Sequence, residues 1–145
     1  MSVVLPDTSV ASLLHPKKKN DVLRAKYEPH LHGQTLALSF QTVAELWEWA
    51  ESSRWGDAAR QRLEAFLRRF LVIPYDYELA KTWAVVMSAA RGAGRRLETG
   101  DGWIIATAVH HRIPLLAHDR DMVGRSIQGL EVISYLEGET DTGRI

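Results

Sequence analysis

Cysteine is absent from the 145 residues of this sequence. Its absence excludes disulfide bonds, thiolate metal sites and cysteine nucleophiles, and it is consistent with a reducing compartment. The sequence also has no uncharged apolar run near the roughly 18 residues that a membrane-spanning helix needs. Its first ten residues, MSVVLPDTSV, have no basic flank and already contain an aspartate, unlike a secretory signal. We therefore expect a cytoplasmic protein with no membrane association.

The sequence also lacks an excess of charge of either sign, because 18 basic residues balance 18 acidic ones. Overall charge therefore gives no argument for nucleic-acid binding. The charges are unevenly distributed, with a basic excess in residues 15–30 and an acidic excess in residues 131–145. Repeats, low-complexity tracts and inter-domain linkers are also missing. We predict one domain over residues 1–136, followed by an acidic C-terminal tail over residues 137–145.

Short β-like runs alternate with segments of helical periodicity along the whole chain. The predicted strands are 2–5, 34–39, 70–75, 114–118 and 130–134. Apolar residues recur every three or four positions in the predicted helices 39–53, 57–70 and 76–92, with a weaker helix at 20–31 that Pro29 interrupts and another that starts at the cap Thr99. This alternation predicts an α/β fold with a mostly parallel sheet.

Acidic residues follow the ends of several predicted strands. Asp7 comes directly after the first strand, and Glu45 lies in the early turns of the helix after the second. Asp101 lies at the start of another helix, in the stretch ETGDGWIIATAVHH, and Asp119 and Asp121 follow the fourth strand. Because strand ends and the starts of the following helices share one edge of a parallel sheet, four separate segments bring carboxylates to that edge.

Such a group of carboxylates has two interpretations. Each acid alone is readily explained as a turn residue or a helix cap. Together, carboxylates repel one another and raise each other's pKa unless a cation neutralises them. Oxygen ligands without cysteine favour Mg²⁺ or Mn²⁺, which can activate water and stabilise a phosphodiester during in-line displacement.

Three stretches resemble one known family. They are VVLPDTSV near the start, TVAELWEWA after the second strand, and TGDGWIIATAVHHRIPLLAHDRDM near the end. In order and spacing they are similar to the PIN-domain family, and most similar to the VapC-type toxin ribonucleases of toxin–antitoxin pairs. The resemblance covers nearly the whole chain. It implies a three-layer α/β/α sandwich around a mostly parallel sheet of about five strands.

The resemblance also implies an activity and a set of site residues. It implies an endoribonuclease that depends on Mg²⁺, with Mn²⁺ as a substitute. Asp7, Glu45, Asp101 and Asp119 match the catalytic acids, and Asp7, Asp101 and Asp119 are then the metal ligands. Thr8, or as the alternative Ser9, is expected to form a hydrogen bond at the site. The family often has asparagine at the position of Asp119, so the division of roles between Asp119 and Asp121 in HDRDM stays open.

Several basic residues are candidates for contacts with RNA phosphates. Arg91, Arg95 and Arg96 lie in the glycine-containing segment RGAGRR just before Asp101. Lys17, Lys18 and Lys19 form a second basic group in the first loop. For both groups a solvated loop is the alternative interpretation. His118, beside Asp119, is either a structural residue or a participant in proton transfer.

Protein partners are suggested by two aromatic residues on one predicted helix. Trp47 and Trp49 are two positions apart, so we expect one of them to be exposed unless another segment covers it. The alternative is one buried and one partly exposed tryptophan, which needs no partner. The resemblance implies a homodimer and a cognate antitoxin protein, and it implies that both contacts use this region. The alternative function is an inactive PIN-like module that binds RNA or protein without cleavage. Other phosphoryl-transfer folds are disfavoured because Ser9 stands where a second aspartate is needed and no lysine follows residue 81.

Overall fold

The computed structural model describes residues 2–16 and 20–136, so Lys17–Lys19 and the acidic tail 137–145 lie outside the described residues. Within that part of the chain, five strands form one parallel sheet in the order β3-β2-β1-β4-β5. Their bounds are β1 Val3–Pro6, β2 Thr35–Ser39, β3 Leu71–Ile73, β4 Leu115–Leu116 and β5 Val132–Ile133. All five predicted strands are present, each within its predicted segment or one residue from it.

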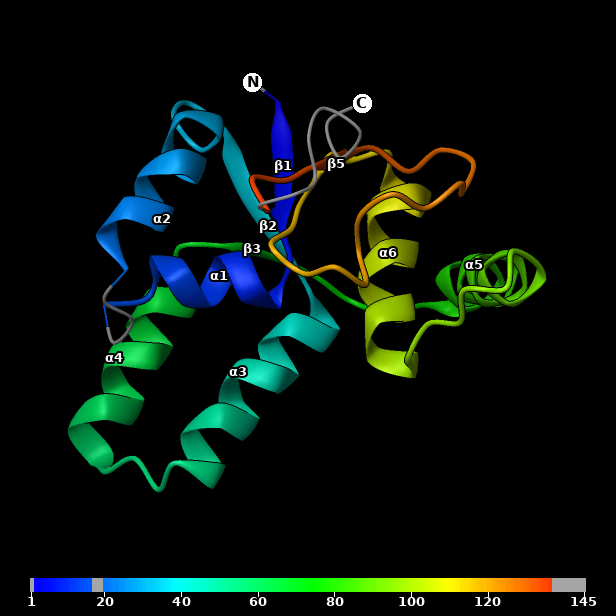
Figure 1. Ribbon diagram of the computed structural model, residues 1–145. Helices are drawn as coiled ribbons and strands as arrows, with labels where there is room; N and C mark the ends of the chain where they lie inside the picture. Colours follow the sequence, from blue (N-terminus) through cyan, green and yellow to red (C-terminus); the bar gives the residue numbers. More distant parts are fainter. Residues whose placement is uncertain (1, 17–19, 137–145) are drawn as a thin grey trace.

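The helices connect successive strands and cover both faces of the sheet (Figure 1). Their bounds are α1 Thr8–Leu14, α2 Asp21–Tyr27, the short 3-10 helix η1 Glu28–His30, α3 Phe40–Ser52, α4 Asp57–Leu67, α5 Tyr77–Gly92 and α6 Thr99–His111. Helices α5 and α6 lie on one side of the strands, and α1, α2 and α4 lie on the other. The predicted three-layer α/β/α fold is therefore confirmed.

The alternating direction of side chains along the strands explains why both faces of the sheet are apolar. Leu5 and Leu115 are fully buried against the α5–α6 layer, whereas their neighbours Val4 and Leu116 pack with the α1–α2 layer. Because successive strand residues point to opposite faces, a strand covered on both sides must be apolar at nearly every position. The continuous apolar runs in the sequence therefore reflect a doubly covered sheet.

Close packing of α5 on α6 depends on one glycine. A Cβ atom at Gly102 would lie 2.4 Å from Met87 Sδ and 3.0 Å from Trp83 Nε1. Any side chain at this position would therefore force Met87 and Trp83 to move. This contact fixes the helix that carries Asp101 against the outer layer of the fold.

Helix starts are only partly as predicted. Ser39 caps α3 and Asp76 caps α5, each accepting a backbone N–H from the first turn. Thr99 was expected to cap α6, but this expectation is wrong: the cap position is Glu98, and its side chain accepts no hydrogen bond there. Thr99 is instead the first helical residue. The first turn of α6 thus has no side-chain cap, and Asp101 is its acidic residue.

Three further details differ from the sequence-based expectations. The short helix α1 was not predicted, and the predicted helix 57–70 ends at Leu67. Neither Trp47 nor Trp49 is exposed, because both are half-buried against the α3–α4 core and Trp49 packs on Trp55 with ring centroids 4.8 Å apart.

None of the described helices is long and apolar enough to span a membrane.

Candidate active site

The carboxyl ends of the central strands lead into the starts of helices α1 and α3, and α6 begins beside them (Figure 1). Asp7 follows β1, Glu45 lies in the second turn of α3, Asp101 lies in the first turn of α6, and Asp119 follows β4. Strand β1 pairs with both β2 and β4, so these segments are neighbours in the sheet. The predicted acids are therefore gathered at one edge.

Asp7 is the most buried of the acids, with only 1% of its surface exposed. Its Oδ1 accepts the backbone N–H of Val10 at 2.9 Å and the hydroxyl of Ser9 at 2.6 Å, so the side chain caps α1. Burial nevertheless raises the pKa of Asp7 to about 7, and the charges of Asp119 and Asp101 add to this rise. Asp7 is thus both a helix cap and a buried carboxyl group with two acidic neighbours.

Glu45 is held by two polar side chains. The hydroxyl of Thr8 donates to Glu45 Oε1, and the amide of Gln41 donates to Oε2 at 2.9 Å. Thr8 also lies 3.1 Å from the hydroxyl of Thr42. The hydrogen bond expected of Thr8 at the site is present. Both oxygens of the glutamate are therefore fixed in orientation before any ligand binds.

Asp101 is half-buried at the start of α6. Burial raises its pKa to about 6, and Asp119, Glu45 and Asp121 contribute further by charge repulsion. Contact between α6 and α3 is close here, because a Cβ atom at Gly100 would lie 2.7 Å from Gln41 Nε2 and 3.0 Å from Glu45 Oε2. The glycine allows the first turn of α6 to approach Glu45.

Asp119 and Asp121 lie in the irregular segment after β4. Asp119 Oδ1 accepts the backbone N–H of Asp121 at 2.9 Å, so it stabilises its own turn. Asp119 is half-buried, and its charge raises the pKa values of both Asp7 and Asp101. Asp121 is exposed, and its charge raises the pKa of Asp101. Burial and neighbours thus favour Asp119 over Asp121 as the inner carboxylate.

The chemistry of these side chains fits a hard divalent cation. Carboxylate oxygens are the ligands that Mg²⁺ and Mn²⁺ prefer, and a cation would relieve the repulsion that raises the pKa values of Asp7 and Asp101. In residues 2–16 and 20–136 no three acidic or histidine side chains are close enough together to bind an ion as they stand. An ion bound here would therefore be held by one or two of these carboxylates, with water completing its coordination, or by carboxylates that draw together.

Sequence comparison agrees with this arrangement. A model of the PIN domain matches residues 4–125, which include every acid described above. The chain belongs to the PIN-domain family. Ribonuclease VapC4 of Mycobacterium tuberculosis is 32% identical over 104 residues, which cover 70% of this chain and 78% of the relative. VapC ribonuclease Y4jK of Sinorhizobium fredii is 30% identical over 148 residues, covering 93% and 99%.

Structural comparison confirms the PIN-domain fold. The crystal structure of VapBC2 from Rickettsia felis, bound to a DNA fragment from its promoter, superimposes with a TM-score of 0.76 at 17% identity. The match covers 91% of this chain and 98% of that chain. The resemblance of the sequence to the PIN-domain family, and within it to VapC-type ribonucleases, is confirmed by these findings.

The three arginines that precede α6 differ in whether their side chains form hydrogen bonds. Arg91, Arg95 and Arg96 are all exposed. The guanidinium of Arg95, however, donates to the backbone carbonyls of Arg120 and Val123. In the described part of the chain no hydrogen bond or ion pair engages the side chains of Arg91 and Arg96, which stay candidates for contacts with RNA.

The side chain of Tyr27 is a buried group beside the acids that the sequence does not indicate. Tyr27 is fully buried, and its hydroxyl donates to the carbonyl of Ala117 at 3.1 Å and accepts the N–H of Tyr135 at 2.9 Å. The same hydroxyl lies 2.7 Å from His118 Nδ1. Burial lowers the pKa of His118, which favours a neutral ring in a structural role. No local pattern marks Tyr27, because its partners lie at the other end of the chain.

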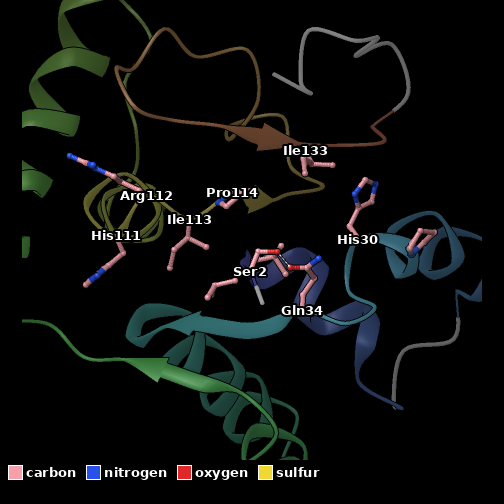
Figure 2. A pocket seen from close by; sticks show the side chains of 11 residues that line it. Ser2, His30, Gln34, His111, Arg112, Ile113, Pro114 and Ile133 are labelled. Atoms are coloured by element: carbon pink, nitrogen blue, oxygen red, sulfur yellow. Dashed lines mark hydrogen bonds between the residues drawn. The ribbon is translucent and has the colours of Figure 1, made fainter.

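A cavity of about 490 Å³ lies at the opposite end of the sheet (Figure 2). Ser2, Gln34 and Pro114 line it, next to the amino ends of β1, β2 and β4. Figure 2 shows that His111 and Arg112, which also border the cavity, extend away from Ser2 and Gln34. None of the acids lines this cavity, so it is separate from the carboxylate edge.

Proposed function

We propose that this chain is an endoribonuclease that requires a divalent cation, Mg²⁺ or in its place Mn²⁺, to hydrolyse RNA phosphodiester bonds. The gathering of Asp7, Glu45, Asp101 and Asp119 at one edge of the sheet carries this proposal. Proteins rarely place carboxylates where burial and mutual repulsion raise their pKa values unless the arrangement has a function. The two curated relatives, both named as ribonucleases, support the same activity.

The side chains have distinct roles in this proposal. Asp7, Asp101 and Asp119 supply carboxylate oxygens to the cation, and Asp121 is the alternative ligand to Asp119. When bound, the cation lowers the pKa of a coordinated water and neutralises charge on the phosphate. Glu45 orients the attacking water, because Thr8 and Gln41 fix both of its oxygens.

RNA binding needs cations away from the acids, since carboxylates repel phosphates. Arg91 is exposed in the last turn of α5 and Arg96 on the segment that leads into α6, and we assign both to the RNA backbone. Arg91→Ala and Arg96→Ala are expected to raise KM and to weaken the salt dependence of RNA binding. The kcat values are expected to stay near that of the wild type.

The partners proposed are a cognate antitoxin and a second copy of the chain. Support for the antitoxin comes from the relatives, among them the VapBC2 complex. Support for a homodimer comes from exposed apolar side chains, such as Phe40 with 51% and Val85 with 68% of their surfaces accessible. Light scattering on the purified chain tests the dimer. A search for a small neighbouring gene, followed by co-expression with its product, tests the antitoxin.

The decisive experiment compares the wild type with Asp101→Asn and Asp76→Asn on total RNA. Asp76 is the matched control, because it accepts the N–H of Leu79 as a helix cap and is not among the charges that affect Asp7 or Asp101. Asparagine caps a helix about as well as aspartate, and Asp101 is not the cap residue of α6, so both variants are expected to fold. With Mg²⁺ or Mn²⁺, the wild type and Asp76→Asn are expected to give discrete cleavage products.

Asp101→Asn is expected to give no cleavage, and EDTA is expected to stop cleavage by the active proteins. If the wild type neither cleaves RNA nor binds a metal in calorimetry, the proposal is wrong. The inactive binding module then becomes the better account of the chain. If Asp101→Asn cleaves as well as Asp76→Asn, Asp101 is only a first-turn residue of α6.

A further inference from the structure

Two arginines connect the loop before α6 with the loop after β4. Arg95 donates to the carbonyls of Arg120 and Val123, the latter at 2.6 Å. Arg125 donates in the opposite direction, to the carbonyls of Arg95 and Arg96, the latter at 3.2 Å, and it also donates to the carbonyl of Asp121 in its own loop. Each loop therefore provides the guanidinium that binds the backbone of the other.

Both loops carry or lead into proposed ligands. The segment 93–98 joins α5 to α6, and Asp101 lies in the first turn that follows it. The segment 119–125 contains Asp119 and Asp121 and has no strand or helix of its own. The buried side chains of Met122 and Val123 anchor this segment to the core. Beyond that anchor, the two arginines set its position relative to α6.

Arginine is suited to this task for a geometric reason. Its planar guanidinium presents five N–H donors in a fixed fork, so one side chain can bind two or three carbonyls at once. Lysine has a single flexible ammonium group and cannot reproduce such a set of contacts. The donors of Arg95 and Arg125 are directed at backbone carbonyls, which leaves fewer of them to bind phosphate.

We propose that Arg95 and Arg125 form a reciprocal clasp that positions the carboxylates of Asp119 and Asp121 against Asp101. They are positioning residues and do not bind the RNA backbone. This inference rests on the proposed function, because the positioned carboxylates are the proposed ligands of the cation. For Arg95 it replaces the role in RNA binding that the sequence predicts.

The test uses Arg95→Lys and Arg125→Lys, with Arg60→Lys as the matched control. Arg60 also bridges a loop, donating to the carbonyl of Trp55 at 2.8 Å and to Glu51 Oε2 at 2.6 Å, but it lies on α4. The affinity for Mn²⁺ is measured by calorimetry on the full chain. We expect it to fall by about tenfold or more in each clasp variant, as is typical when the partner of a ligand is lost. Arg60→Lys is expected to bind Mn²⁺ like the wild type.

Kinetics separate positioning from RNA binding. In the clasp variants kcat at saturating Mn²⁺ is expected to fall by about tenfold, with KM for RNA within about twofold of the wild type. A higher KM with unchanged kcat would instead make Arg95 and Arg125 RNA-binding residues and overturn the proposal. Unchanged Mn²⁺ affinity and unchanged kcat in both variants would overturn it as well.

Hydrogen exchange on the metal-free protein gives a readout that does not depend on activity. The N–H of Met122 donates to the carbonyl of Asp119 at 3.0 Å, and that of Asp121 donates to Asp119 Oδ1. Both amides are expected to exchange faster in the clasp variants and at the wild-type rate in Arg60→Lys. Wild-type exchange rates in both clasp variants would show that the segment keeps its position without the clasp.

The same measurements distinguish failure of the clasp from failure of the proposed function. A wild type that binds Mn²⁺ but cleaves no RNA contradicts the proposed function, and the clasp is then judged by Mn²⁺ affinity and hydrogen exchange. A wild type that binds no Mn²⁺ overturns both. If one lysine variant fails to fold, the other carries the test.

Discussion

The hydroxyl of Ser9 donates to Asp7 Oδ1 at 2.6 Å and accepts the backbone N–H of His118 at 3.0 Å. It thereby connects the start of α1 with the end of β4. Ser9→Ala would leave the partly buried N–H of His118 without this acceptor, so we expect the free energy of unfolding to fall by about 1–2 kcal/mol. Urea unfolding measures the change. Ser12→Ala is the control, because its hydroxyl only bonds the nearby carbonyl of Ser9, and an equal loss there would contradict the prediction.

Asp7→Asn is expected to stabilise the metal-free protein while abolishing cleavage. Asparagine can still cap α1 through its side-chain oxygen, and it carries no charge to be buried. Since burial raises the pKa of Asp7 to about 7, we expect a gain of about 2 kcal/mol at pH 8 in EDTA. Thermal unfolding measures it. Added Mn²⁺ should raise the melting temperature of the wild type but not that of the variant, and an equal rise in both would remove Asp7 from the metal site.

The stability of the metal-free protein should fall as the pH rises. The folded-state pKa values of Asp7, about 7, and Asp101, about 6, both exceed the ordinary aspartate value of 3.8. Between pH 4 and 7 the native state therefore binds more protons than the unfolded state, and its free energy of unfolding decreases with pH. Urea unfolding at several pH values in EDTA tests this. Asp7→Asn should flatten the dependence, and a wild-type stability that increases over this range would contradict the prediction.

Gly100→Ala should reduce activity with little effect on stability. The new Cβ would lie 2.7 Å from Gln41 Nε2 and 3.0 Å from Glu45 Oε2, which are the flexible ends of their side chains. They can move at small cost, but the movement disturbs the orientation of Glu45. We expect kcat to fall at least tenfold, with a change in unfolding free energy below about 1 kcal/mol. Gly92→Ala, where no atom lies within 4 Å, is the control and should keep full activity.

Tyr27→Phe should destabilise the fold, because one hydroxyl serves several partners. Its loss would leave the N–H of Tyr135 and the carbonyl of Ala117 without their hydrogen bonds to this hydroxyl. Since Tyr27 is fully buried, we expect a loss of about 2–3 kcal/mol in chemical unfolding. A loss below about 0.5 kcal/mol would show that solvent or neighbouring groups replace the hydroxyl.

The strands and the acidic edge could be predicted from the sequence because their signals are local. A doubly covered parallel strand is apolar at nearly every position, as in the run that contains Val4 and Leu5. An acid that follows such a strand must lie at its carboxyl end, whatever the details of the neighbouring helices. The positions of Asp7 and Asp119 therefore followed from strand assignment alone.

Other features depend on contacts between distant segments, which a single sequence does not reveal. Helix α1 has only seven residues, too few for a clear periodic pattern, and it relies on the Asp7 cap. Neither tryptophan on α3 is exposed, because Trp55 and the α4 core cover the face on which Trp49 lies. The partners of Arg95 are backbone carbonyls, which carry no sequence signature at all.

The strand order has a consequence for the growing chain. Strands β1 and β4 pair side by side, although β1 is made first and β4 only after α6. During translation the ribosome therefore releases Asp7, Glu45 and Asp101 well before Asp119 can complete the edge. The proposed carboxylate site of a nascent chain would therefore stay incomplete until Asp119 has emerged from the ribosome.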